Sequence, residues 1–485
     1  MTLPRLEPGA ILDGFRLGER IHRGGMAAIW EATHPDFDFP LLMKVPKMSE
    51  GVDPAAIVGF EMEQMILPRL GGPHVPRYVA QGDFGLQPYL VFERIPGTSL
   101  LPLLTQLPLS IEAVTSLGIR AAVALDDLHR QHVVHLDVKP SNLMTRPTGE
   151  IVLLDFGLSH HDELPDLMGE EFRLPYGTAP YMAPEQVLGH RRDPRSDQFA
   201  LGVLLYFFLT GRRPFGDPQR LAGLKQRLWR DPVPPRKLRP ECPPWLQEVI
   251  LRCLEVHPAW RYPTSGHLAM ALQHPDQIKL TMRAEKLKQD PFLTVLRRRF
   301  ADHQLVVPTA KNPARHDGDA PILAVAIDLS PEAAPIADTL RTLVARMLTT
   351  LPGARVACLN VLKLGRITLD QTLDAQGRNI HHQRLVELRS WAIPLELEEG
   401  RVSYHVLESP DPASAILQYV SVNHVDHLVM GARASSLRRT LLGSVSSQVA
   451  AQAPCTVTVA RSLRLRASNL PPEPKEEDDV PWTVG

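Results

Sequence analysis

The sequence has no long apolar run and few cysteines. No stretch of about 18 apolar residues occurs, and the first residues, MTLPRLEPGAILDGF, lack the charged-then-apolar layout of a signal peptide. The four cysteines are far apart, so they form neither a disulfide framework nor metal-ligand pairs. These absences predict a cytoplasmic protein that does not associate with membranes.

An excess of one charge is also absent. Lys and Arg number 53 and Asp and Glu number 54, which leaves a formal net charge of -1. This balance argues against nucleic acid and membrane surfaces as partners. Apolar residues make up 44% and charged residues 22%, as in globular proteins. Because 485 residues exceed the about 250–300 that one hydrophobic core serves, we expect two domains.

Two regions of the chain differ in their periodicity. Residues 14–100 contain short apolar runs bounded by turn residues, which predict strands around one helix at 55–70. Residues 101–275 contain long apolar stretches that predict helices. From residue 320 onward, strand runs alternate with helical runs, which predicts a mostly parallel, doubly wound α/β sheet.

The remaining segments lack these patterns. Residues 276–318 are interpreted as a partly helical linker with exposed helices. Its Arg297–Arg299 cluster is either a solvated helix face, the favoured interpretation, or a docking site for an acidic partner. The tail, residues 463–485, is acidic and proline-rich and is predicted to be disordered.

Residues suited to phosphoryl transfer follow one another in the first region. Gly24 and Gly25 lie between two strand runs, where glycine lets backbone N–H groups approach phosphates. Lys44 stands in an apolar strand, and Glu63 on the next helix could hold it as an ion pair. HLDVKPSN at 135–142 and Asp155-Phe156-Gly157 follow. Their two acids and one Asn near strand ends suit Mg²⁺, which takes oxygen ligands together with substrate phosphates.

Residues 14–275 resemble a bacterial, eukaryotic-type Ser/Thr protein kinase. Nine pieces stand in the order of that family: IHRGGMAAIW, LLMK, FEME, LVFERI, HLDVKPSN, DFG, GTAPYMAPE, DQFALG and HPAWR. The resemblance implies the α+β two-lobed protein-kinase fold. Its N-lobe would span 14–95 and its C-lobe 96–275, after an N-terminal extension over 1–13.

The resemblance also implies roles for single residues. Lys44 would contact the ATP phosphates and Glu63 would anchor it; Asp137 would orient the substrate hydroxyl, and Lys139 would neutralise the moving phosphoryl group. Asn142 and Asp155 would hold Mg²⁺, or Mn²⁺ in its place. The ATP-binding residues implied are Ile21, Gly24, Gly25, Met26, Ala27, Ile29, Lys44, Glu93, Ile95, Asn142 and Asp155. The implied scaffold consists of Thr178 at the acceptor site, a Glu185–Arg261 ion pair, and Asp197 capping backbone amides of the catalytic loop.

The glycine-rich loop departs from the family pattern. His22 stands at the position of the first glycine and Ala27 at that of the third, although Gly24 is present. Each replacement adds a Cβ and narrows the backbone options. One interpretation is weakened ATP handling, as in a pseudokinase scaffold that binds nucleotide and partners. Tolerated variation is favoured, because every charged catalytic group is present.

The activation segment, residues 158–176, departs as well. Leu136 replaces the Arg that in the family pairs with a phosphorylated residue of this segment. The segment has Ser159 as its only Ser or Thr, and it carries five acids, Asp162, Glu163, Asp166, Glu170 and Glu171. We therefore expect activity without phosphorylation of this segment. The alternative, in which the acids simply form a solvated loop, is compatible with the same expectation.

Residues 319–462 resemble a universal stress protein (UspA-like) domain, a doubly wound fold similar to the adenine-nucleotide α-hydrolases. The first strand ends in Asp328-Leu329-Ser330, and the last third reads HLVMGARASSLRRTLLGSVSSQVAAQAPCTVTVAR. The nucleotide-binding branch of that family has Gly-x-x-Gly, a spacer, and Gly-Ser; here Gly431 is followed by Ala434 and, after a shorter spacer, by Gly443-Ser444. The site implied for a second adenine nucleotide is Asp328, Gly431, Gly443 and Ser444, and the alternative is that these glycines serve turns and helix packing.

The sequence thus predicts an ATP- and Mg²⁺-dependent kinase for Ser or Thr hydroxyls of a protein substrate. Its C-terminal domain would regulate, sense nucleotide, or form a homodimer through the edge strand CTVTVAR. A nucleic-acid binder is disfavoured by the balanced charge. His381 and His382 have no carboxylate or Cys at ligand spacing and are interpreted as surface residues.

Overall fold

The computed structural model describes residues 6–23, 27–47, 53–83, 87–172, 176–300, 321–351, 353–363, 379–397, 401–423, 425–432 and 444–461. The predicted residues Gly24, Gly25, Met26, Ala434 and Gly443 and the tail lie outside these ranges. We refer to the part up to residue 300 as the first domain and to the part from 321 as the C-terminal domain.

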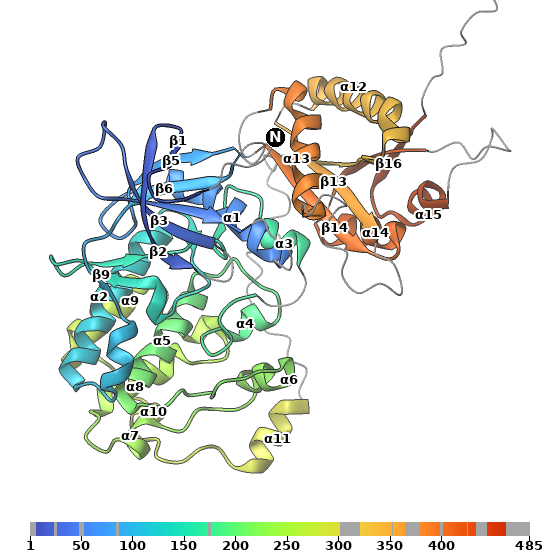
Figure 1. The fold of residues 1–485 in the computed structure, drawn as a ribbon. Coiled ribbons are helices and arrows are strands. Elements are labelled where there is room, and N and C mark those ends of the chain that lie inside the picture. Colours follow the sequence, from blue (N-terminus) through green and yellow to red (C-terminus); the bar gives the residue numbers. More distant parts are fainter. Residues whose placement is uncertain are drawn as a thin grey trace, which may run out of the picture.

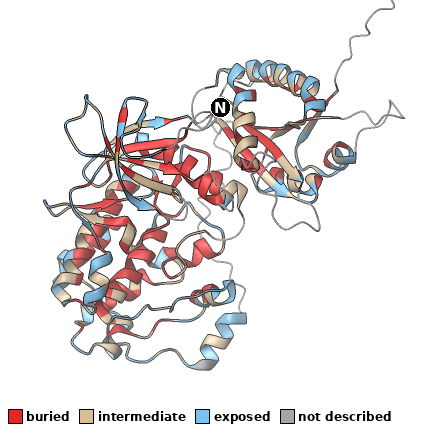
Figure 2. Cartoon of the chain, viewed as in Figure 1, coloured by how far each residue is buried: buried red, intermediate tan, exposed pale blue. Residues whose placement is uncertain are grey.

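An antiparallel sheet forms the small lobe of the first domain (Figure 1), with strand order β1-β2-β3-β4-β6-β5. The strands are β1 (Ile11–Leu12), β2 (Phe15–Arg23), β3 (Ala27–Thr33), β4 (Leu41–Pro46), β5 (Tyr78–Gly82) and β6 (Tyr89–Glu93). Helix α1 (Pro54–Ile66) begins at Asp53, whose side chain accepts the N–H of Ala55. Most of α1 is buried (Figure 2), so it is covered on more than one face.

Helices make up most of the large lobe. Its core is built by the long helices α2 (Ile111–Arg130), α5 (Arg195–Thr210), α8 (Pro244–Cys253) and α9 (Ser265–Gln273). The shorter helices are α3 (Leu167–Glu171), α4 (Pro184–Val187), α6 (Leu221–Leu224) and α7 (Pro235–Leu238). Short strands flank the loops near the boundary of the two lobes: β7 (Thr98–Ser99), β8 (Val133–Val134), β9 (Leu143–Thr145), β10 (Ile151–Leu153) and β11 (His160–His161). The two-lobed fold is therefore confirmed.

Residues 276–300 form two helices whose residues are mostly exposed, and polar contacts tie them to the large lobe. Helices α10 (Met282–Glu285) and α11 (Phe292–Phe300) follow α9 and are held on the large lobe. The backbone N–H of Ala284 donates to Glu248, and Lys286 and Arg298 both pair with Asp231. Composition alone did not indicate this docking, because the acidic partners lie more than 30 residues earlier in the chain.

A five-stranded parallel sheet forms the centre of the C-terminal domain, with order β14-β13-β12-β15-β16. The strands are β12 (Ile322–Ala326), β13 (Arg355–Lys363), β14 (Val402–Ser409), β15 (His427–Gly431) and β16 (Thr456–Ala460). Helices α12 (Ala334–Thr350) and α13 (Ile380–Ala392) cover one face, and α14 (Pro412–Val422) and α15 (Ser444–Gln452) cover the other. This confirms the doubly wound α/β fold.

One prediction for this domain was wrong. His381 is 4% exposed, and its Nδ1 lies 3.3 Å from Oε1 of Glu408 on β14. The side chain is buried because α13 packs that face of the helix onto the sheet, a contact that sequence spacing does not reveal.

Candidate active site

Lys44 lies at the centre of a charged cluster between the two lobes. Its Nζ is 2.5 Å from Oε2 of Glu63 on α1 and 2.9 Å from Oδ1 of Asp155. Burial disfavours the charged ammonium, but the two carboxylates outweigh it and raise the pKa of Lys44. The Lys44 ammonium in turn lowers the pKa of Asp155, against the effect of burial. Both groups therefore stay charged near neutral pH.

Asp137 lies in the loop after β8, opposite this cluster. Its Oδ2 accepts hydrogen bonds from Lys139 Nζ at 2.5 Å and from Asn142 Nδ2 at 3.1 Å. Its Oδ1 accepts from the hydroxyl of Thr178 at 2.8 Å, and Lys139 Nζ also reaches that hydroxyl at 3.0 Å. The carboxylate is thus fixed in orientation, next to a cation, at the wall of the space between the lobes.

Asp197, at the start of α5, binds the backbone of this loop. Its carboxylate accepts the N–H groups of His135 and Leu136, each at 2.8 Å. Leu136 adopts a φ of 63°, which is uncommon for a residue with a Cβ, and Asp197 stabilises that conformation. Glu185 and Arg261 form the expected ion pair, with both side chains fully buried. Asp197, Glu185 and Arg261 therefore stabilise the conformation of the site.

The segment that joins the lobes is tied to the large lobe. Glu93 at the end of β6 is bound by both Nη atoms of Arg146, which follows β9, at 2.5 and 2.9 Å. The hydrogen bonds from Arg146 lower the pKa of Glu93 against its partial burial. This bidentate pair is a positioning contact that sequence reasoning missed, since the two residues are 53 positions apart.

A cavity of about 710 Å³ joins these groups, which is within the usual size of small-molecule sites. Sequence-predicted residues that line it are Ala27, Ile29, Lys44, Glu63, Asp137, Lys139, Asn142 and Asp155. His22 and Phe92 also line it. Among the other predicted residues, Ile21 is 46% exposed, and neither Ile21, Glu93 nor Ile95 is among the residues that line the cavity.

The donor set at one end of the cavity fits Mg²⁺. The Asp155 side chain is about half exposed, and Asn142 lines the same cavity. Mg²⁺ takes one or two protein oxygen ligands and completes its shell with water and substrate phosphates. Within the described part of the chain, no group of three or more His, Cys, Asp or Glu could hold a metal ion.

Two glycines fix helix α1 against the Asp-Phe-Gly turn. A Cβ on Gly59 of α1 would lie 3.2 Å from the carbonyl oxygen of Gly157, and one on Gly157 would lie 3.0 Å from that of Gly59. The two backbones are therefore in direct contact, beside the buried ring of Phe156. A glycine in the middle of a helix pattern was the available signal, and the sequence reasoning passed over it.

The activation segment is ordered where it is described: Asp162 and Glu163 are exposed, as in the solvated-loop alternative, but the other three acids are paired. Ser159 is fully buried and donates to the carbonyl oxygen of His135 at 3.1 Å. Asp166 caps α3 and pairs with Arg191 at 2.9 Å, and Arg191 lowers its pKa despite burial. Glu170 and Glu171 pair with side chains of the C-terminal domain. Long-range contacts decide this, so the local sequence could not show it.

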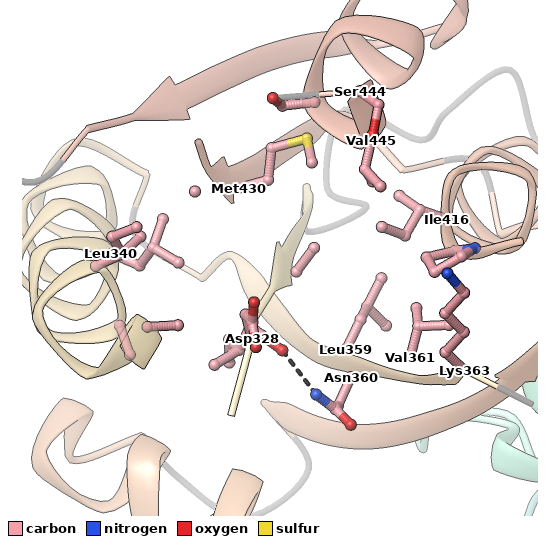
Figure 3. Close-up of a pocket in the computed structure, with 18 residues that line it drawn as sticks. Asp328, Leu340, Leu359, Asn360, Val361, Lys363, Ile416, Met430, Ser444 and Val445 are labelled. Atoms are coloured by element: carbon pink, nitrogen blue, oxygen red, sulfur yellow. Dashed lines mark hydrogen bonds between the residues drawn. The ribbon is translucent and has the colours of Figure 1, made fainter. Parts of the chain in front are cut away.

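A second cavity, of about 520 Å³, opens at the carboxyl ends of β12, β13 and β15 in the C-terminal domain (Figure 3). Asp328 and Ser444 line it from opposite sides, and Lys363 lies at a third side. Asn360 donates to the carbonyl oxygen of Ile327 at 2.9 Å and holds the turn that carries Asp328. Sequence reasoning missed Asn360 and Lys363.

Gly431 also lines this second cavity. A Cβ there would lie 2.3 Å from Cγ2 of Ile336 on α12. The absence of a side chain at Gly431 therefore allows α12 to pack closely against the end of β15.

Comparisons with known proteins agree with this geometry. The family model of the protein kinase domain matches residues 15–275, and that of the universal stress protein family matches residues 321–461. The serine/threonine-protein kinase PknA of Mycobacterium tuberculosis is 33% identical over 271 residues, 54% of this chain and 62% of its own length. PknB of Mycolicibacterium smegmatis is 29% identical over 290 residues, 58% of this chain and 46% of its own length.

The chain thus spans less than two thirds of the length of these relatives. A solved structure of the M. tuberculosis PknI kinase domain is similar with a TM-score of 0.43 and 23% identity, over 56% of this chain and 100% of that one. In the described part of this chain, no helix has the length and apolarity to cross a membrane. Because the kinase model matches more than half of the chain, the chain belongs to the protein kinase family, with a universal stress protein domain after the kinase domain.

Proposed function

We propose that this chain is an ATP-dependent protein serine/threonine kinase that transfers the γ-phosphoryl group of ATP to a protein hydroxyl. The observation that carries the proposal is one cavity lined both by Lys44, paired to Glu63 and Asp155, and by Asp137, paired to Lys139. Phosphoryl transfer depends mainly on positioning and charge stabilisation, and this arrangement supplies both.

Each charged group has a place in the proposed reaction. Lys44 binds the α- and β-phosphates, and Glu63 keeps its ammonium in place. Asp137 orients the incoming hydroxyl and accepts its proton, while Lys139 stabilises the charge on the moving group. Asn142 and Asp155 hold Mg²⁺, or Mn²⁺ in its place, which neutralises phosphate charge when bound.

The alternative, a pseudokinase scaffold, rests on His22 and Ala27 in the glycine-rich loop. Both residues line the cavity without filling it. A scaffold has no physical need for an orienting Asp137 beside a cation, nor for an ordered Lys44–Glu63 pair. The kinase proposal accounts for both.

We further propose domain limits that follow the packing. The N-terminal extension is residues 1–13, the kinase lobes are 14–95 and 96–275, and the stress protein domain is 319–462. The linker begins after residue 300 rather than at 276, because α10 and α11 are held on the large lobe.

The C-terminal domain is proposed to bind an adenine nucleotide in its own cavity. Asp328 and the apolar residues around it are suited to the base and ribose, and Lys363 is suited to the phosphates. We also propose a homodimer through β16, which is an edge strand of the sheet. A cytoplasmic location fits an ATP-using enzyme whose four cysteines are free.

The decisive experiment measures Mg²⁺-dependent transfer from labelled ATP by the full-length chain. Autophosphorylation and transfer to a generic basic protein are followed beside the Asp137→Asn variant. We expect label in the parent and a loss of at least about 100-fold in the variant. Retained ATP binding without transfer by the parent would support the scaffold instead.

The second site is tested separately by calorimetry. ATP is titrated into the Lys44→Met variant, which removes the main phosphate contact of the kinase site. One remaining binding event that Asp328→Ala abolishes is expected. The absence of any remaining binding would contradict a nucleotide site in the C-terminal domain.

A further inference from the structure

The C-terminal domain contacts the kinase domain at helices α1 and α3. In Figure 1, α3 lies between α1 and the end of the C-terminal domain that carries β14 and α14. Leu167 and Met168 of α3 are buried in an apolar cluster that also includes residues of α1 and Val406 of β14. Because β14 is an edge strand, this packing covers one edge of the C-terminal sheet.

Cations of the C-terminal domain neutralise both acids at the end of α3. Arg355 of β13 binds Oε1 of Glu170 at 2.9 Å, and the Tyr419 hydroxyl of α14 donates to the same carboxylate at 3.0 Å. His405 of β14 lies between the acids, with Nε2 3.0 Å from Glu170 and Nδ1 3.2 Å from Glu171. The activation segment is therefore held by side chains that come from more than 180 residues later in the chain.

A separate ion pair holds helix α1. Arg389 of α13 binds Oε1 of Glu61, and its guanidinium lies over the ring of Tyr404 at 5.1 Å. Glu61 is 3% exposed and stands two residues before Glu63, the partner of Lys44. The same domain thus contacts both elements that must be in place for catalysis, α1 and the activation segment.

The charges at this contact depend on each other. His405 is fully buried, and Glu171 has a nearly buried side chain. Departure of the C-terminal domain would remove the Arg355, His405 and Tyr419 side chains that hold the end of α3. The acids would then return to water, and α3 would lose its apolar contact with β14.

The position of the contact favours activation over inhibition. Every described residue that lines the kinase cavity lies between His22 and Thr178, so the C-terminal domain does not block it. With this domain docked, the Lys44–Glu63 and Asp137–Lys139 pairs are formed. The contact therefore coincides with the arrangement that catalysis needs.

We propose that the stress protein domain is a tethered activator of the kinase domain. It forms ion pairs with Glu170 and Glu171 of α3 and with Glu61 of α1. These contacts order the activation segment, as a phosphorylated residue paired with an Arg does in other kinases. The role rests on the proposed kinase function. It also explains a kinase domain that has Leu136 in place of that Arg and a buried serine as the only Ser or Thr of the segment.

The test uses charge reversal in the full-length chain. Arg389→Glu places two carboxylates together at the α1 contact, and the double variant Arg389→Glu with Glu61→Arg restores opposite charges. We expect kcat for a basic protein substrate to fall between about fivefold and about 100-fold in the single variant. The double variant is expected to recover most of this loss, which also shows that the single variant did not simply misfold.

A structural readout accompanies the rates. Hydrogen exchange at 54–66 and 158–172 is expected to rise in Arg389→Glu and in Arg355→Glu, and to return in the double variant. Arg341→Glu is the matched control, because Arg341 lies on α12 and pairs with Asp338 of the same helix. It should change neither rate nor exchange.

Several results would overturn the proposal. A higher kcat in Arg389→Glu would make the contact inhibitory. An unchanged kcat with faster exchange would show that docking is not coupled to catalysis. Unchanged exchange in both single variants would show that the domains do not dock in this way. If the parent itself transfers no phosphate, the kinase function fails by itself, and docking is then judged by the exchange and by the Kd for Mg²⁺-ATP, which should weaken in Arg389→Glu.

Discussion

At the scale of single residues, the burial of Ser159 and of His405 bears on how the activation segment is regulated. Ser159 is the only Ser or Thr from Leu158 to Tyr176, and its hydroxyl is fully buried in a hydrogen bond to His135. A kinase that acts on this segment could not reach it without unfolding the turn after Asp155-Phe156-Gly157. The scarcity of Ser and Thr in the segment and the burial of Ser159 thus both lead us to expect activity without phosphorylation of this segment.

We therefore predict that active enzyme carries no phosphate within residues 158–176. Mass spectrometry of purified protein before and after incubation with Mg²⁺-ATP measures this directly. Phosphatase treatment is expected to leave the initial rate within about twofold, because no phosphate orders the segment. An essential phosphate found at Ser159 would contradict both the prediction and the role assigned to the C-terminal domain.

His405 predicts how docking depends on pH. Burial disfavours its imidazolium, but Glu170 and Glu171 outweigh burial and raise the pKa of His405 to about 9, with Arg355 and Tyr419 also facing this group. Since the folded pKa lies above the ordinary value of about 6.5, the stabilisation is complete below about pH 6.5 and is lost as pH rises through about 9.

The measurement is the exchange of α3 amides at pH 7.0 and 9.5, corrected for the intrinsic pH dependence of exchange. Protection is expected to fall with pH in the parent. His405→Gln, which cannot be protonated, should start with lower protection and change little. Equal loss in both proteins would assign the effect to another group.

At the scale of elements, helix α1 contacts both the C-terminal domain and the kinase site, so its position depends on both. Its outer side is bound by Arg389 through Glu61, its inner side presents Glu63 to Lys44, and its backbone touches Gly157 at Gly59. Most of the helix is buried, as expected for an element between two packed surfaces. A shift of α1 by even a few tenths of an ångström therefore changes the geometry around Asp155.

Gly59→Ala is predicted to lower kcat by about tenfold, because its Cβ would press on the carbonyl oxygen of Gly157 and move the Asp155 turn. The thermal midpoint should change little, since Ala favours a helix over Gly by about 1 kcal/mol and offsets part of the strain. Gly71→Ala is the control, because open space surrounds that position. Full activity of Gly59→Ala would show that this backbone contact is not needed.

At the scale of the whole molecule, the two edges of the C-terminal sheet have different surroundings. The β14 edge lies against α3 of the kinase domain, while β16 is the opposite edge and has no strand beyond it within the described ranges. Docking and dimerisation would therefore use opposite edges, so that a dimer leaves each activator on its own kinase domain.

We predict that light scattering of the full-length chain gives about twice the monomer mass of 54.0 kDa. Thr456→Lys, which places a charge at an exposed position of the β16 edge, should give the monomer mass. The kinase rate per chain should stay unchanged, because β16 does not contact α1 or α3. A monomer at micromolar concentration in the parent would refute dimerisation.

The sequence by itself determined both folds and most of the chemistry of the kinase site. Motifs such as HLDVKPSN and Asp155-Phe156-Gly157 are short, so their residue types and spacing carry the information locally. The hydrophobic periodicity likewise identified the strands and helices around them. Lys44, Glu63, Asp137 and Asn142 could be named because each belongs to such a segment.

Only the tertiary structure decided the contacts between distant segments. The Glu93–Arg146 and Glu170–Arg355 pairs join residues 53 and 185 positions apart, and the pairing of distant charges leaves no local pattern. For the same reason, the sequence did not show that Asp166, Glu170 and Glu171 are paired, and His381 was interpreted as a surface residue. Burial and charge pairing are properties of surfaces that meet in space, and the meeting of the two domains creates them here.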